Sequence, residues 1–257
     1  MPLTKTINRS NLPGLPRERL TEDEKGITHP SMMHTYSPQH PIPTMLVPRE
    51  LNYLAWLGAQ CGTAGRVIEL GCFLGGSTAA LLDQLDPRHE LISYDAFQIP
   101  PIENERTAKW LAQYGLRPGE HFRDKFDALT RAWSDRIIAR QGWLPEYAAG
   151  FDPDAIYPEQ EPIELLFCDI AKTWGVHLSV LHAFGSHLIP GSTLVHQDFF
   201  DLQTPWIPLH MWQLRDELTP LDVIHGTPTA SFRCISPISH RLPEMLRQDH
   251  PAEELEA

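Results

Sequence analysis

The side chains best suited to metal binding or proton transfer lie in two polar segments. Each of these segments directly follows an apolar run. Asp169 directly follows the apolar run 163–168, and Asp198 follows a second apolar run that ends at residue 196. If these runs are neighbouring parallel strands, their carboxyl ends meet at the edge of the sheet where open α/β sheets bind ligands. Two carboxylates there, with Gln197 as a candidate third oxygen donor, suit Mg²⁺ or a similar hard cation. The plainer interpretation is that Asp169 caps the following helix and Asp198 is an ordinary loop acid.

His196, at the end of the second apolar run, is a candidate proton acceptor, because imidazole exchanges a proton near neutral pH. Since successive side chains of a strand alternate between faces, the direction in which His196 points is undecided, and a packed structural histidine is the alternative. Trp174, His177 and Trp206 are candidate walls of a substrate pocket, and packing explains them equally well.

A glycine-rich turn follows the apolar run 66–70 and precedes a helix-like segment that begins at Ser77. Gly71 and Gly75 allow the backbone to bend tightly and to approach a ligand. The turn is not the GxGxxG fingerprint, because Phe73 stands at the middle glycine, and it lacks the Gly-Lys-Ser/Thr of a P-loop. A pyrophosphate cradle is therefore disfavoured, and a purely structural turn is the alternative.

Two further strand ends present side chains that suit a nucleoside. Asp95 follows the run 90–94, where a carboxylate can accept hydrogen bonds from both hydroxyls of a ribose. Gly142 and Trp143 follow the run 136–140, and an indole offers a flat apolar surface to an adenine ring. The alternatives are a solvated loop acid and a core tryptophan.

The pattern Glu-x-Gly-x-x-x-Gly of residues 69–75 resembles motif I of the class I S-adenosylmethionine-dependent methyltransferases, whose loop carries the amino-acid half of the cofactor. Gly-Trp after the third strand looks like the macrocin O-methyltransferase group of sugar methyltransferases. Together these resemblances imply a set of cofactor-binding residues: Glu69, Gly71, Phe73, Gly75, Ser77, Asp95 at the ribose, Gly142, Trp143 and Asp169.

Asp-x-x-Lys at 169–172, followed one strand later by adjacent polar ligands, is similar to the catechol and caffeoyl-coenzyme A O-methyltransferases. The resemblance implies that Asp169 and Asp198 bind a metal, with Gln197 as a third ligand, and that Lys172 is the general base. The chain departs from both groups at Gln197, because macrocin-type enzymes have two adjacent acids there and catechol-type enzymes usually have Asp-Asn. Mg²⁺ dependence is therefore an expectation that needs its own test.

Helical and strand-like segments alternate from Pro48 onward, which is typical of a parallel sheet with helical crossovers. Strands are expected at 66–70, 90–94, 136–140, 163–168, 193–196, 221–224 and 230–234, and helices from Pro48 to before Gly62 and at 77–85, 102–133, 174–188 and 206–217. A short turn separates the last two strands, so an antiparallel pair is expected there. The expected architecture is a Rossmann-like α/β fold: the seven-stranded class I methyltransferase sheet, with helices on both faces and an antiparallel last strand, over residues 48–257.

Residues 1–47 are expected to form an extended N-terminal arm or lid without regular structure, because eight of the 24 prolines lie in the first 50 residues. The chain has 33 acidic against 21 basic residues and a formal charge of −12. This charge disfavours nucleic acid and anionic membranes as partners. The four cysteines form no CxxC pair, and no apolar stretch approaches a membrane span or a secretory signal. A cytoplasmic protein with reduced thiols fits these observations.

The function expected is that of an S-adenosylmethionine-dependent, Mg²⁺-dependent O-methyltransferase for a small hydroxylated acceptor, a sugar or a phenol of secondary metabolism. One alternative is a nicotinamide or nucleotide-sugar oxidoreductase on a Rossmann sheet. Another is a non-catalytic partner subunit that kept the cofactor fold. The acceptor and the oligomeric state, with a homo-oligomer as one option, are not readable from the sequence.

Overall fold

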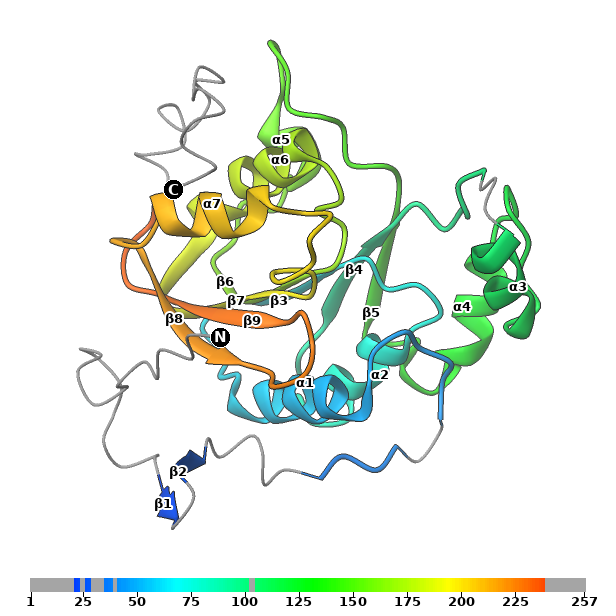
Figure 1. The fold of residues 1–257 in the computed structure, drawn as a ribbon, viewed down its shortest axis with the longest axis horizontal. Coiled ribbons are helices and arrows are strands. Elements are labelled where there is room, and N and C mark those ends of the chain that lie inside the picture. Colours follow the sequence, from blue (N-terminus) through cyan, green and yellow to red (C-terminus); the bar gives the residue numbers. More distant parts are fainter. Residues whose placement is uncertain (1–20, 24–25, 29–34, 39–40, 102–104, 239–257) are drawn as a thin grey trace, which may run out of the picture.

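The computed structural model describes residues 21–23, 26–28, 35–38, 41–101 and 105–238. Its centre is a seven-stranded sheet in the order β5-β4-β3-β6-β7-β9-β8 (Figure 1). The strands are β3 (Arg66–Leu70), β4 (Leu91–Asp95), β5 (Ile137–Gln141), β6 (Ile163–Cys168), β7 (Leu188–His196), β8 (Leu218–Val223) and β9 (Ala230–Cys234). The first five run parallel, whereas β9 is antiparallel to both β7 and β8. The expected sheet, including its antiparallel end, is confirmed.

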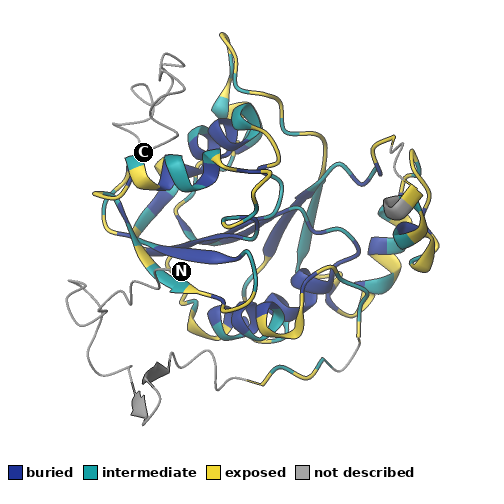
Figure 2. Cartoon of the chain, in the orientation of Figure 1, coloured by how far each residue is buried: buried dark blue, intermediate teal, exposed yellow. Residues whose placement is uncertain are grey.

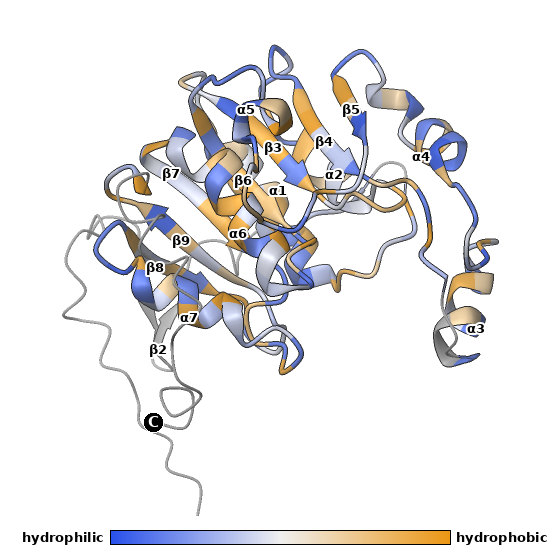
Figure 3. Cartoon of the chain, turned by 90° about the horizontal axis from the view of Figure 1, so that it is seen from above, coloured by the Kyte–Doolittle hydropathy of each residue, from blue (hydrophilic) through white to orange (hydrophobic). Residues whose placement is uncertain are grey.

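Helices cover both faces of the sheet (Figure 1). Helices α1 (Pro48–Gln60) and α2 (Gly76–Leu82) lie on one face. On the other lie α5 (Pro153–Ile156), α6 (Trp174–Phe184) and α7 (Trp206–Gln213). Because side chains alternate along a strand, Val67 packs with the α1–α2 face and Ile68 with the α6–α7 face, and both are fully buried. Figure 2 shows that the strands are buried and that the helices around them are more exposed. Figure 3 shows that many residues of these strands are hydrophobic.

The helix expected at 102–133 is wrong as a single element. The structure has two helices here, α3 (Glu105–Gln113) and α4 (Arg123–Leu129), followed by a 3-10 turn over Arg131–Trp133. Gly115 and Gly119 have positive φ values of 66° and 79°, and Pro118 lacks the N–H that a helix requires. These three residues end one helix and set the direction of the next.

Within its described residues, the expected arm, 1–47, contains regular structure at one place. Strands β1 (Thr21–Asp23) and β2 (Gly26–Thr28) pair antiparallel, so the expectation of an arm without regular structure is wrong there. The two strands lie between Pro16 and Pro30, in a stretch where no proline removes a backbone donor. Most of the remaining arm lies outside the described residues.

Residues 35–38 and 41–47 run onto the main domain. Tyr36 donates its hydroxyl to Asp83 over 2.8 Å and its N–H to Asn52 over 2.8 Å. In the part of the chain that the structure describes, no helix is both long and apolar enough to cross a membrane. All four cysteines are free thiols, and three of them are buried.

Candidate functional site

A pocket of about 590 Å³ opens at the carboxyl ends of the parallel strands, where such sheets bind ligands. Among the residues that line it are seven of the sequence-predicted ones: Gly71, Phe73, Asp95, Gly142, Trp143, Asp169 and Lys172. The others predicted for cofactor binding or catalysis, Glu69, Gly75, Ser77 and His196, do not line it. The structure therefore brings four separate strand ends to one cavity and leaves several flanking residues in the core.

The glycine-rich turn is held to the end of β4 by Asp95. One carboxylate oxygen of Asp95 accepts hydrogen bonds from the backbone N–H groups of Cys72, at 3.1 Å, and Phe73, at 2.9 Å. Its other oxygen accepts the N–H of Phe97 at 2.8 Å, which leaves one lone pair of that oxygen for a ligand. Gly71 has φ +88°, and a Cβ there would lie 3.0 Å from the carbonyl oxygen of Asp169. The turn requires glycine at this position.

Phe73 also adopts a positive φ, of 47°, which is uncommon for a residue with a side chain. Its ring stacks on Trp110 at 5.8 Å between centroids and meets Phe122 edge-on at 5.7 Å. This aromatic contact fixes the turn against the segment that follows β4. Position 73 therefore serves as an anchor, in place of the glycine of a dinucleotide-binding turn.

Glu69 lies beneath the turn and has no exposed surface. Its Oε2 accepts hydrogen bonds from Thr78, at 2.6 Å, and Ser93, at 2.9 Å, whereas its Oε1 has no protein partner. Burial raises the pKa of Glu69 from 4.5 to about 7, although hydrogen bonds from Ser77, Thr78 and Ser93 act to lower it. Glu69 therefore supports the turn from inside the sheet.

Replacing Glu69 by Gln is expected to flatten the dependence of stability on pH. The native carboxyl keeps its proton up to a pH of about 7, whereas the unfolded chain releases it near pH 4.5. The native state then binds more protons between these values, so the wild-type free energy of unfolding falls as pH rises through this window, by at most about 3 kcal/mol. Urea unfolding at pH 5, 6, 7 and 8 measures the free energy of unfolding of both proteins across this window. Parallel curves for wild type and Glu69→Gln would contradict the expectation.

The pocket wall also includes residues from outside the glycine-rich and acidic motifs. Met45, from the arm, lines the pocket although its side chain is 55% exposed, and Thr44 packs where a Cβ of Gly76 would stand. Trp143 is 63% exposed, so the alternative of a core tryptophan is wrong. Glu146 accepts a 2.5 Å hydrogen bond from Thr173, and both residues line the pocket. The residues after β4 that line the pocket are Ala96, Gln98, Ile99 and Pro100. No motif of the sequence marks these four residues.

The ends of β6 and β7 bring Asp169, Lys172 and Asp198 together. Lys172 Nζ lies 2.7 Å from Asp169 Oδ1 and also contacts Asp198 Oδ2. The side chains of Asp169 and Asp198 are only 15% and 12% exposed, whereas that of Lys172 is 55% exposed. One ammonium group thus bridges two largely buried carboxylates.

Gln197 completes this cluster. The end of its side-chain amide lies 3.2 Å from Asp169 Oδ1 and 2.5 Å from Asp198 Oδ1. With the NH₂ group turned toward them, the amide donates to both carboxylates; with the oxygen turned toward them, three oxygens converge. Adjacent ligand oxygens of an octahedral Mg²⁺ lie about 3 Å apart, since each is about 2.1 Å from the ion. The 3.2 Å separation between Gln197 and Asp169 is close to this value, and the 2.5 Å separation between Gln197 and Asp198 is shorter, so the amide lies within metal-ligand reach of both carboxylates.

The charges of this cluster alter its proton affinities. Burial raises the pKa of Asp169 to about 6, with Lys172 acting to lower it and Asp198 and Glu50 adding to the rise. For Lys172, burial lowers the pKa, but the charges of Asp169 and Asp198 outweigh burial and the pKa lies above the ordinary range of lysine. In this arrangement Lys172 is a stable ammonium ion. To accept a proton, it must first leave the two carboxylates.

His196 is fully buried and its ring does not reach the pocket. It packs edge-on against His177 at 4.8 Å between ring centroids, and His177 Nδ1 lies 2.8 Å from His210 Nδ1. Burial lowers the pKa of His196 to about 3, so the imidazole is neutral near pH 7. The structure thus favours the packed structural histidine over the proton acceptor. Trp174, His177 and Trp206 likewise lie behind the pocket and do not line it.

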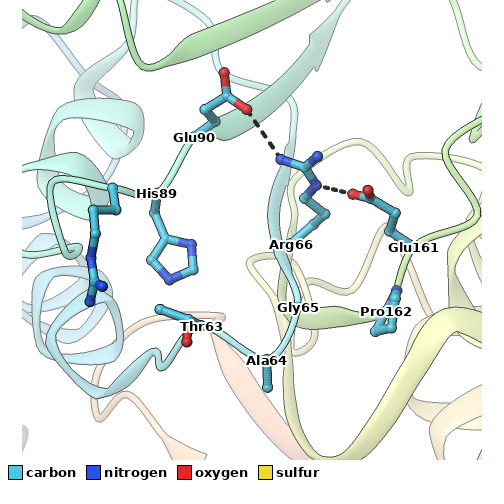
Figure 4. Close-up of a pocket in the computed structure, with 9 residues that line it drawn as sticks. Thr63, Ala64, Gly65, Arg66, His89, Glu90, Glu161 and Pro162 are labelled. Atoms are coloured by element: carbon cyan, nitrogen blue, oxygen red, sulfur yellow. Dashed lines mark hydrogen bonds and ion pairs between the residues drawn. The ribbon is translucent and has the colours of Figure 1, made fainter.

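A second pocket, of about 510 Å³, lies at the amino-terminal start of β3 (Figure 4). Arg66 there is paired with Glu90 at 3.2 Å and also with Glu161. Arg66 is thus neutralised by two acids of this pocket, and the pocket lies at the edge of the sheet away from the predicted site. The carboxyl-edge pocket is therefore the candidate active site.

No protein-family model and no curated protein matches the sequence. Solved structures do match. The calicheamicin methyltransferase CalS11 has a TM-score of 0.51 and 18% sequence identity, over 72% of this chain and 77% of that one. The O-methyltransferase NovP has a TM-score of 0.51 and 13% identity, over 81% and 90%. The chain has the class I methyltransferase fold. In this methyltransferase fold the β9–β8 pair forms the antiparallel end of the sheet, and the glycine-rich turn joins β3 to α2.

Proposed function

We propose that this chain is an S-adenosylmethionine-dependent O-methyltransferase that transfers a methyl group to a hydroxyl of a small acceptor, a sugar or a phenol. The observation that carries the proposal is the single pocket that joins Gly71 and Asp95 to Asp169 and Lys172. The likeness to CalS11 and NovP supports a methyltransferase, and the description of NovP supports an oxygen acceptor.

The pocket fits the cofactor in three respects. Gly71 lines the pocket and has no side chain, so a ligand can approach the backbone of the turn there. Asp95 lines the pocket and one lone pair of its carboxylate has no protein donor, which suits a hydroxyl of the ligand. Trp143 presents an exposed ring on the pocket wall, which suits stacking on a purine. We assign the ribose to the remaining lone pair of Asp95.

The same edge of the sheet fits a divalent cation, with Asp169, Gln197 and Asp198 as its ligands. All three donors are oxygens, which Mg²⁺ prefers. Among the described residues no group of three His, Cys, Asp or Glu side chains suits a metal, and it is the amide of Gln197 that brings this donor set to three. Metal dependence thus relies on a neutral third ligand.

When bound, S-adenosylmethionine supplies an electrophilic methyl group, and Mg²⁺ supplies positive charge for an acceptor hydroxyl. The protein's own residues align the reactants. Asp95 and the turn line one side of the pocket, and Asp169 and Lys172 line the other, with Asp198 held to them through Lys172. Lys172 is the candidate base, because its Nζ lies at the pocket edge and its side chain is half exposed. His196 is not assigned this role, since it is enclosed in the core.

The experiment is a calorimetric titration of the protein with S-adenosylhomocysteine, in Mg²⁺ and in EDTA. Saturation at one molecule per chain supports the cofactor assignment, and absence of binding under both conditions rejects it. Transfer of labelled methyl groups to a panel of catechols and sugars then separates an enzyme from a non-catalytic cofactor-binding subunit. The oxidoreductase alternative is not favoured, because the fold and its neighbours are those of methyltransferases.

A further inference from the structure

The ammonium group of Lys172 lies where the two strand ends present their negative charge. It is 2.7 Å from Asp169 Oδ1, at the end of β6, and it also contacts Asp198 Oδ2, next to the end of β7. No other described lysine or arginine forms an ion pair with either aspartate. Lys172 is therefore the cation that holds these two carboxylates together.

One oxygen atom serves both this ion pair and the cation site. Asp169 Oδ1 accepts from Lys172, and the same atom lies 3.2 Å from the end of the Gln197 side chain, with which it would share a metal ion. A divalent cation and an ammonium ion at one carboxylate oxygen repel each other strongly in a partly buried site. The two cations therefore compete for Asp169.

The surrounding charge makes a cation necessary. Glu50 is only 3% exposed and accepts hydrogen bonds from the N–H of Val47 and the hydroxyl of Thr229. Thr229 in turn bonds the carbonyl oxygen of Gln197 at 3.2 Å, which ties this acid to the metal-ligand loop. Two largely buried carboxylates thus face one ammonium, with the buried acid Glu50 linked to their loop, and a buried carboxylate without a counter-charge is costly.

Lys172 has space to leave. Its side chain is 55% exposed and lines the pocket, whereas the two aspartates are largely enclosed. A lysine side chain has four rotatable bonds and swings its ammonium into solvent at low cost. A displaced Lys172 would stay on the side of the pocket where the acceptor is expected.

We propose that Lys172 is an internal counter-ion that occupies the cation site, and that binding of a divalent cation displaces it from Asp169 and Asp198 into the pocket. The inference rests on the metal site of the proposed function. It adds that the metal and the Lys172 ion pair are mutually exclusive, so that metal binding is what frees the candidate base.

The test is titration of EDTA-treated protein with Mg²⁺ alone, in wild type, Lys172→Met, Lys172→Arg and Lys125→Met. Removing the competing ammonium is expected to tighten Mg²⁺ binding about tenfold in Lys172→Met. Lys172→Arg keeps the charge and a forked donor for the carboxylates, so its affinity is expected to equal or fall below wild type. Lys125 pairs with Glu120 outside the site, so Lys125→Met controls for the loss of one positive charge and should bind as wild type does.

Thermal unfolding supplies a second readout. Without Mg²⁺, Lys172→Met is expected to melt below wild type, and its gain in melting temperature on adding Mg²⁺ is expected to exceed that of wild type. Lys172→Gln repeats the comparison if the methionine variant does not fold.

If wild type binds Mg²⁺ and folded Lys172→Met binds it equally or more weakly, the proposed displacement of Lys172 by the metal is wrong, whereas the metal site itself is retained. Absence of Mg²⁺ binding in every variant would overturn the metal site and this inference with it. Neither result bears on the assignment of S-adenosylmethionine as the cofactor, because the titration with S-adenosylhomocysteine tests that assignment independently.

Discussion

Asp95→Ala is expected to lower the affinity for S-adenosylhomocysteine by about two orders of magnitude. Hydrogen bonds from hydroxyls to a carboxylate are each worth about 1.5–3 kcal/mol, and every 1.4 kcal/mol is a factor of ten in affinity. The same carboxylate accepts the backbone N–H groups of Cys72, Phe73 and Phe97. Its removal leaves these donors unpaired, so the turn loses the shape that receives the ligand.

Calorimetry checks this expectation with two comparisons. Asp95→Asn keeps one acceptor oxygen and should bind between the alanine variant and wild type. Asp86→Ala removes an acid that pairs locally with Arg88, away from the pocket, and should bind like wild type. Wild-type affinity in a folded Asp95→Ala protein would remove Asp95 from the site.

Asp169→Ala is expected to abolish measurable Mg²⁺ binding, a loss of at least about a hundredfold. Only two carboxylates and one amide face the cation site, so the variant retains a single charged ligand. S-adenosylhomocysteine binding should change far less, because the turn and Asp95 do not depend on the Asp169 carboxylate. The prediction is thus a selective loss of the metal.

Calorimetry with Mg²⁺ and with S-adenosylhomocysteine measures the two affinities separately. Asp201→Ala is the matched control, since this acid lies on the same loop as Asp198 and bonds the N–H of Gln203 at 2.9 Å. Activity that stays at the wild-type level and is insensitive to EDTA in Asp169→Ala would end the metal proposal.

The positions of the strands, and therefore of their ends, were the most predictable part of this molecule. Short apolar runs bounded by glycine or charge predicted strands 66–70, 163–168 and 230–234 at the residues where the structure has them. Parallel topology then placed Asp95 and Asp169 on one edge, because the carboxyl ends of neighbouring strands meet there. These are consequences of local pattern and chain direction, which a sequence contains.

Side-chain direction was less predictable. His196 and Gln197 are adjacent, yet the first is enclosed between α6 and α7 and the second faces two carboxylates. Alternation places the two side chains on opposite sides, but the sequence does not reveal which side reaches the site. Met45 lay in a proline-rich segment without periodicity, and its place on the pocket wall follows from tertiary contacts of Tyr36 and Thr44.

The position of β9 has a consequence for the growing chain. This strand completes the hydrogen bonding of β7, yet it is among the last described elements to be synthesised. Until Ala230–Cys234 emerges from the ribosome, β7 offers an unpaired apolar edge, which is a template for aggregation. Chains that stop before Ala230 should therefore be insoluble even though they carry all the residues assigned to the cofactor and the metal, and a tag that delays release of the C-terminal hairpin should lower the yield.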